Sequence, residues 1–155
     1  MRPTLIMRIN IRYILLNKNN IIIRLSKVIE KSFPLFNNWI NQIKCNQTIS
    51  PFNNIYFSPV HITYVCKIIL DIINEKDNGG IWQVSSKEPI NYYTAIKYIA
   101  EKLHLNQSLI LPKESAKLGS QNNIYHMDSL RLEKTFNISP PNYTDTLNDF
   151  LQYEK

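Results

Sequence analysis

The feature that most constrains the fold is the isoleucine triplet at 21–23, which follows an asparagine-rich turn signal at 17–20. Consecutive β-branched residues of this kind predict a strand that is covered on both faces, as the strands of parallel sheets are. Arg24, Ser26 and Lys27 then place polar and cationic groups at the carboxyl end of this strand. Ligands of open α/β sheets bind beyond the carboxyl ends of strands, so these residues are candidate contacts. The alternative is that Arg24 and Lys27 are solvated flanks of an ordinary strand.

The rest of the apolar pattern predicts helices and short strands around this strand, with a long polar loop at 113–125. Helical spacing and capping residues indicate helices at about 8–16, 34–43, 61–73, 92–103 and 144–151, with a short one after Asp128. Short apolar runs indicate further strands near 48–49, 55–57, 81–84 and 109–111. These elements predict an α/β fold with a few-stranded, mostly parallel sheet and flanking helices. The length of 155 residues suits one globular domain.

Charge and hydropathy narrow the class of partner. The formal net charge of +6 would permit attraction to nucleic acid, anionic lipid or a phosphorylated ligand. The basic residues are dispersed and are not interleaved with stacking aromatic residues, which argues against nucleic acid. Arg8, Asn10 and Arg12 interrupt the N-terminal apolar pattern before it reaches the length of a signal-peptide core or a membrane span. We therefore expect a soluble, cytoplasmic protein that does not bind membranes.

Several common chemical motifs are missing from the sequence. Cys45 and Cys66 are the only cysteines and lack a C-x-x-C spacing, so we expect reduced, buried thiols and neither a disulfide framework nor a zinc site. The three histidines have no mutual spacing that would hold a metal. The three glycines form neither a G-x-G-x-x-G motif nor a P-loop. We therefore expect no metal and no bound cofactor in this chain.

One pair has a spacing known from catalysis. Tyr93 and Lys97 match the Tyr-x-x-x-Lys pattern of short-chain dehydrogenases, in which the ammonium lowers the pKa of the phenol one helical turn away. The pair follows the strand at 81–84 and starts a helix whose other residues look structural. Tyrosine and lysine are also abundant in the chain. We interpret the spacing as a coincidence and predict no catalytic residue here.

A second set of residues is a candidate pocket lining. Ser26, Lys27, Phe33, Ser58 and Pro59 lie at predicted strand ends or in the loops next to them. A cationic side chain with hydroxyls beside aromatic rings would suit a phosphorylated sugar or a nucleotide. The same residues would also be compatible with solvated loops that bind nothing.

Seven segments occur in an order that is typical of a known family. They are IIRLSKV (22–28), FPLFNNW (33–39), ISPFNNIYFSPV (49–60), GIWQVS (80–85), INYYTAIKYIA (90–100), DSLRL (128–132) and PP (140–141). This series resembles the C-terminal half of the dTDP-4-dehydrorhamnose reductase-like proteins, which belong to the extended short-chain dehydrogenases that act on nucleotide sugars. No single segment is diagnostic, and the match runs from about residue 13 to residue 150.

The resemblance implies an incomplete Rossmann-like domain, with a poorly defined segment at 1–12 and a sugar-nucleotide substrate-binding half-domain at 13–155. It implies that Ser26, Lys27 and Val28, together with the segment through Ser58 and Pro59, border the nucleotide-sugar pocket. NAD(P) is implied for the full-length family, whose cofactor loop and catalytic tyrosine–lysine helix lie upstream of the matched strand. Tyr93 and Lys97 align instead with a helix of the substrate-binding half. Asn54 stands where the family more often has aspartate.

Two hypotheses follow from these observations. The first is the substrate-binding portion of a sugar-nucleotide reductase or epimerase-like oxidoreductase, which binds a dTDP- or UDP-linked sugar and is inactive alone. The second is a non-catalytic interaction module, or the remnant of a truncated reading frame. Its unpaired sheet edge would pack against a missing Rossmann half or a second copy of the chain.

Overall fold

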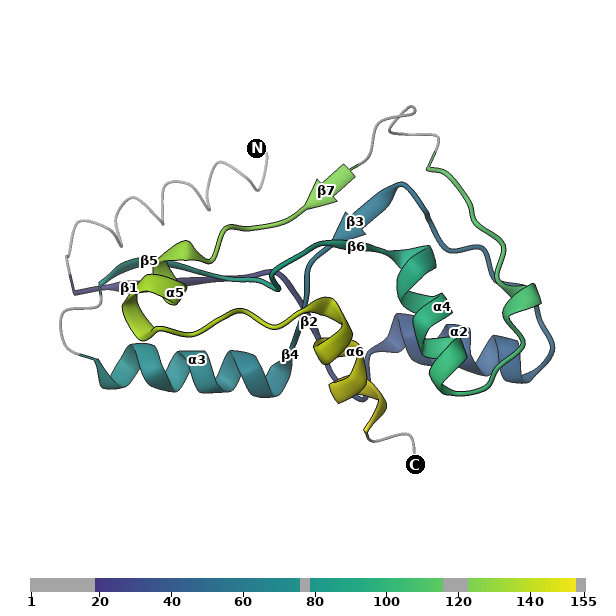
Figure 1. Ribbon diagram of the computed structural model, residues 1–155, viewed down its shortest axis with the longest axis horizontal. Helices are drawn as coiled ribbons and strands as arrows, with labels where there is room; N and C mark the ends of the chain where they lie inside the picture. Colours follow the sequence, from purple (N-terminus) through teal and green to yellow (C-terminus); the bar gives the residue numbers. More distant parts are fainter. Residues whose placement is uncertain (1–18, 76–78, 116–122, 153–155) are drawn as a thin grey trace, which may run out of the picture.

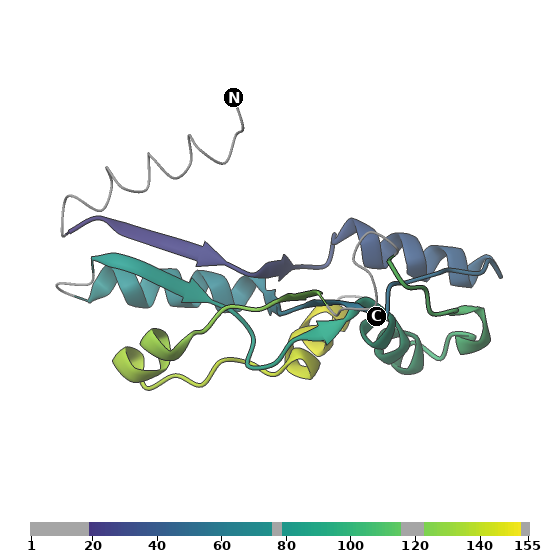
Figure 2. The same cartoon turned by 90° about the horizontal axis from the view of Figure 1, so that it is seen from above.

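The computed structural model describes residues 19–75, 79–115 and 123–152 (Figure 1). The predicted segment 1–12 and the predicted helix at 8–16 lie outside these residues. Figures 1 and 2 show an elongated arrangement of the elements, with two helices at one end and paired strands with two further helices at the other. In chain order the elements are β1 (Ile21–Leu25), β2 (Lys27–Ile29), α2 (Pro34–Lys44), β3 (Ile55–Phe57), β4 (Pro59–His61), α3 (Ile62–Asn74), β5 (Gly80–Val84), β6 (Ile90–Asn91), α4 (Tyr92–Lys102), the 3₁₀ helix η1 (Gln107–Leu109), β7 (Asn123–Tyr125), α5 (Leu130–Phe136) and α6 (Tyr143–Leu151).

The described strands form three small sheets and confirm the predicted α/β class. β1 pairs with β5 and β2 pairs with β4, both in parallel. β3 lies between β6, which is antiparallel to it, and β7, which is parallel. Ser26 alone separates β1 from β2, so the chain changes its strand partner from β5 to β4 across one residue. The strand predicted from the isoleucine triplet is therefore followed at once by a second strand, which belongs to another sheet.

The prediction that this strand is covered on both faces is wrong. Ile21 is 38% exposed and Leu25 is 42% exposed. Within the described part of the chain β1 pairs along one edge only, with β5. Trp82 and Val84 of β5 are fully buried, so the apolar contacts of this sheet concentrate on β5.

Most predicted helices are confirmed, and their ends follow from local chemistry. Pro34 occupies the first turn of α2, where its missing N–H costs nothing. The Asn91 side chain accepts a hydrogen bond from the Thr94 N–H and so caps α4. The His61 ring accepts one from the Thr63 N–H at the start of α3. These side chains satisfy N–H groups that the first helical turn leaves without a partner.

Other local predictions are wrong. The strand predicted at 109–111 is instead the end of η1, because the Asn106 side chain accepts from the Ser108 N–H and starts a tight turn. Ile110 forms only an isolated bridge to Ile49. β4 and β7, of three residues each, were not predicted. The predicted burial of the two cysteines is also wrong, since both are exposed. Cys45 lies at the end of α2 and Cys66 lies within α3, and both thiols are free.

Two apolar clusters hold the elements together. The first contains Phe36 of α2 and joins α2, α4, α6 and β3, and the second contains Trp82 of β5 and joins α3, α5 and β5. Both side chains are fully buried. No helix in the described ranges is both long and apolar enough to cross a membrane.

Gly80, at the start of β5, has a backbone conformation that favours glycine. Its φ of +102° is a conformation that L side chains rarely adopt, and a Cβ added there would lie 3.0 Å from Nη1 of Arg131. That guanidinium lies 3.7 Å from the centroid of the Trp82 ring and donates to the carbonyls of Gly79 and Ile81. We expect Gly80→Ala to lower the free energy of unfolding by about 1–3 kcal/mol in a urea titration.

Gly79→Ala is the comparison, because Gly79 precedes β5 whereas Gly80 is the first residue of that strand and has the positive φ. A compatible glycine replaced by alanine changes stability little or raises it slightly. If the two variants unfolded at the same urea concentration, this account of Gly80 would be contradicted.

Candidate functional site

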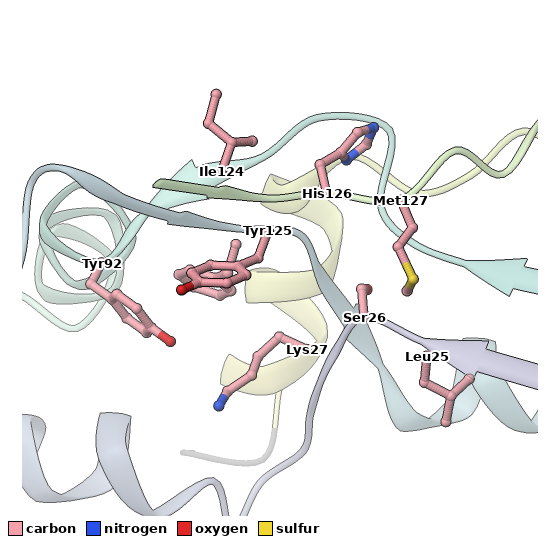
Figure 3. Close-up of a pocket in the computed structure, with 9 residues that line it drawn as sticks. Leu25, Ser26, Lys27, Tyr92, Ile124, Tyr125, His126 and Met127 are labelled. Carbon is pink, nitrogen blue, oxygen red and sulfur yellow. The ribbon is translucent and has the colours of Figure 1, made fainter. Parts of the chain in front are cut away.

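A cavity of about 590 Å³ opens where β1 ends and β2 begins (Figure 3). Its wall comes from three parts of the chain: the β1–β2 junction, the β3 and α4 region, and the end of β7 with the residues that follow it. The lining residues are Leu25, Ser26, Lys27, Phe57, Tyr92, Ile124, Tyr125, His126 and Met127. The cavity therefore lies at the carboxyl end of a parallel strand, where ligands of open α/β sheets bind.

Hydrogen bonds through Ser26 and Ser58 hold the wall together. The Ser26 N–H donates to the carbonyl of Val84 at 2.9 Å, and its hydroxyl donates to the carbonyl of Ser58 at 2.6 Å. Ser58 is fully buried, and its Oγ lies 2.7 Å from Nδ1 of His126. Two serines thus connect the ends of β1 and β5 to the segment after β7.

Lys27 brings a positive charge to this wall. Its ammonium lies 5.4 Å from the centroid of the Phe33 ring, within the range of a cation–π contact. In Figure 3 the Lys27 ammonium and the hydroxyl groups of Tyr92 and Tyr125 extend toward the same side of the cavity. An anion on that side would meet one cation and two phenolic donors.

Aromatic rings supply the apolar part of the wall. The rings of Phe57 and Tyr92 stack with their centroids 4.4 Å apart and their planes 22° apart. Tyr125 and Ile124 are 64% and 59% exposed, so much of their apolar surface faces solvent. Exposed aromatic surface of this kind can stack against a nucleobase.

The Tyr92 hydroxyl group can act as a hydrogen-bond donor. Burial raises the pKa of the Tyr92 phenol above its usual value, and the nearby Tyr125 adds to the rise. Because the phenol stays protonated at neutral pH, it can donate to an anion such as a phosphate.

The structure brings some of the predicted site residues together. Ser26 and Lys27 line the cavity, Phe33 lies under the Lys27 ammonium, and Ser58 contacts the cavity through His126. Val28 and Pro59 lie outside this lining: Val28 packs against the Trp82 cluster, and the buried Pro59 accepts a hydrogen bond from Thr146 through its carbonyl.

Seven lining residues were missed from the sequence: Leu25, Phe57, Tyr92, Ile124, Tyr125, His126 and Met127. The last three lie in or just after a stretch predicted to be a long polar loop. Parallel pairing of β7 with β3 brings them to the cavity, with Tyr56 opposite Ile124. The sequence signal that could have found them is an aromatic residue and a histidine shortly before Asp128, whose carboxylate accepts a hydrogen bond from the Leu130 N–H at the start of α5.

Tyr93 and Lys97 are placed away from this cavity lining. The Lys97 ammonium lies 5.5 Å from the centroid of the Tyr93 ring, over its face. The Tyr93 ring packs against the Phe36 cluster. The pair therefore contributes packing and a cation–π contact to α4.

The described residues do not fit a nicotinamide dinucleotide. Dinucleotide-binding folds approach the pyrophosphate with a glycine-rich turn at the carboxyl end of a strand. Gly79 and Gly80 lie instead at the amino end of β5, and Gly119 lies outside the described residues. We assign no chemical step to such a cofactor. In the same part of the chain, no group of three or more His, Cys, Asp or Glu side chains could hold a metal ion.

The fold is similar to about half of several solved structures, among them a dehydratase and a reductase. No protein-family model and no curated protein matches the sequence. Among solved structures, dTDP-glucose 4,6-dehydratase from Bacillus anthracis in complex with NAD has a TM-score of 0.74 at 13% identity, over 96% of this chain and 48% of that chain.

Two further structures resemble it. The dTDP-4-dehydrorhamnose reductase from Bacillus anthracis in complex with NADP has a TM-score of 0.69 at 19% identity, over 85% of this chain and 48% of that chain. The enzyme WbmG from Bordetella bronchiseptica in complex with NAD and UDP has a TM-score of 0.70 at 14% identity, over 85% of this chain and 43% of that chain. The resemblance predicted from the sequence is thus confirmed at the level of the fold, and the chain spans about half the length of these structures.

Proposed function

We propose that the chain binds a nucleotide sugar and that the 590 Å³ cavity holds its nucleoside diphosphate. The observation that carries the proposal is Lys27 at the end of a parallel strand, with the Tyr92 and Tyr125 hydroxyls extended toward the same side. An ammonium binds phosphate by charge-assisted hydrogen bonds, and neutral phenols add further donors. The volume falls within the roughly 300–1,000 Å³ of small-molecule sites.

The aromatic wall complements the nucleoside. The exposed ring of Tyr125 can stack against a base, and the stacked rings of Phe57 and Tyr92 support that side of the cavity. The structural neighbours favour the same ligand class, since two are named for dTDP-linked sugars and one holds UDP.

We further propose that the chain is the substrate-binding portion of a reductase or epimerase-like protein and is inactive alone. Its three glycines do not form a dinucleotide loop, and Tyr93 and Lys97 are engaged with each other away from the cavity. The isolated chain should therefore not consume NADPH when a nucleotide sugar is supplied.

Isothermal titration calorimetry with UDP, dTDP and uridine tests the proposal. We expect saturable binding of UDP and dTDP, with uridine at least about tenfold weaker, because hydrogen bonds to a charged group contribute about 1.5 kcal/mol or more. An absorbance assay for NADPH serves as the check on turnover. Equal affinities for UDP and uridine, or no binding of either, would contradict phosphate recognition at Lys27.

A further inference from the structure

β1 is an edge strand in the described part of the chain. It pairs with β5 alone, and Figure 2 shows it along the outer border of the described elements. Just before the strand, the Gly80 N–H donates to the Asn20 carbonyl at 2.7 Å, and just after it the Ser26 N–H donates to the Val84 carbonyl at 2.9 Å. In a parallel ladder, every second residue of a strand directs both its N–H and its C=O to the same neighbour. The even-numbered residues of β1 therefore bond to β5.

The odd-numbered residues of β1 face the other edge. The N–H and C=O groups of Ile21, Ile23 and Leu25 point away from β5, toward a side on which no described strand lies. A row of such groups is a ready template for pairing with another strand. The three side chains also share one face of the strand, and the outer two, Ile21 and Leu25, are exposed. The edge thus offers both hydrogen bonds and apolar contacts.

This edge is complementary to itself. If two copies of β1 pair antiparallel about a two-fold axis at Ile23, Ile23 lies opposite itself and Ile21 lies opposite Leu25 of the second copy. These are all hydrogen-bonded pairs, because the odd-numbered residues direct their backbone groups outward. Each exposed isoleucine then meets an exposed leucine on the same face. Arg24 lies opposite Ile22, so no two like charges of β1 lie directly opposite each other.

The pairing would also enlarge a small sheet. β1 and β5 form a two-stranded sheet, and sheets of three or more strands are the more stable ones. Two copies would share a four-stranded sheet in the order β5, β1, β1, β5. The contact would extend over five residues, or about 17 Å of strand. An interface built mainly on one strand of this length is smaller than that of a permanent dimer, so we expect weak and reversible association.

We propose that the chain associates into a two-fold dimer through antiparallel pairing of β1 with β1 of a second copy. Two observations carry the proposal: the outward backbone groups of the odd-numbered residues, and the placement of Ile21 and Leu25 at equal distances in sequence from Ile23. The dimer contact borders the large cavity, because Leu25 also lines it. The pairing does not depend on nucleotide binding.

Sedimentation equilibrium of the full chain over a wide range of concentrations tests the dimer. We expect wild-type protein to show a monomer–dimer equilibrium. Ile21→Lys should weaken the association at least about tenfold, because each dimer would place two ammonium groups against Leu25 side chains at the paired edge. Leu70→Lys is the matched control, since it adds the same charge at an exposed leucine of α3, and it should change the dissociation constant by no more than about twofold.

Disulfide trapping tests the register of the pairing. The background carries Cys45→Ser and Cys66→Ser, because both native thiols are exposed. Ile23→Cys would place two thiols opposite each other with their Cα atoms about 5.5 Å apart, which suits a disulfide. Ile21→Cys is the comparison, since its two copies would lie about 14 Å apart along the paired strands. We expect mild oxidation to give a cross-linked dimer with Ile23→Cys only.

Three results would overturn the proposal. Wild-type protein that is monomeric at every concentration would mean that another part of the chain, or another protein, covers the edge. Equal weakening by Ile21→Lys and Leu70→Lys would show that added charge opposes association without regard to β1. Cross-linking through Ile21→Cys, or none through either cysteine in protein that sediments as a dimer, would exclude a two-fold axis at Ile23. Circular dichroism of each variant shows that the comparison is made between folded chains.

Discussion

Replacing Lys27 with methionine is expected to weaken UDP binding by about 10- to 100-fold. Methionine keeps an unbranched apolar stem and removes the ammonium, which is the one lysine or arginine charge in the lining of the large cavity. Hydrogen bonds to charged groups contribute about 1.5–3 kcal/mol, and each 1.4 kcal/mol corresponds to about a factor of ten in affinity. Calorimetric titration of both proteins with UDP measures the difference.

Lys102→Met is a closely matched control for this variant. The Lys102 ammonium lies 5.4 Å from the Tyr98 ring centroid, the same distance that separates Lys27 from Phe33. Both substitutions therefore remove one positive charge and one cation–π contact, but only Lys27 lines the cavity. Equal effects of the two variants on UDP affinity would show that net charge, and not the site, attracts the nucleotide.

Replacing Phe36 with alanine is expected to lower the free energy of unfolding by about 3–5 kcal/mol. The ring is fully buried and packs against the rings of Phe33, Phe57 and Phe150 at centroid distances of 5.0, 6.4 and 5.7 Å. Alanine would leave a cavity where elements from four parts of the chain meet. A urea titration followed by circular dichroism measures the change.

Phe52→Ala is the comparison, since Phe52 is only half-buried and its ring lies 5.9 Å from the Lys113 ammonium. We expect a loss of about 1 kcal/mol there, which is typical of substitutions outside a core. A Phe36→Ala variant as stable as Phe52→Ala would mean that the Phe36 cluster does not hold α2, α4 and α6 together.

The sequence was most informative where periodicity extends over several turns. α2, α3 and α4 carry wide apolar faces and recognisable starts, so their positions could be read within a residue or two. Even there helical spacing does not give the limit of the buried face, since Ile73 at the end of α3 is 64% exposed. Apolar residues near a helix end need a neighbouring element to cover them, which periodicity does not reveal.

Short strands and the full cavity required the tertiary structure. β4 and β7 have three residues each, too few for an alternating pattern to stand out. The division of 21–29 into two strands depends on which strand pairs on either side of Ser26. Ser26 and Lys27 were found because strand ends are where α/β sheets bind ligands, whereas Tyr125 and His126 reach them only through the pairing of β7 with β3.

The most direct test of the account is the site of UDP contact, observed by amide chemical shifts in nuclear magnetic resonance spectra of the labelled chain. Binding in the large cavity predicts that the largest shifts on adding UDP occur at Lys27, Tyr92, Tyr125 and His126, with little change at the distant end of α2 near Lys44. Shifts concentrated elsewhere, or none at UDP concentrations that saturate the calorimetric signal, would contradict a nucleotide site at the end of β1.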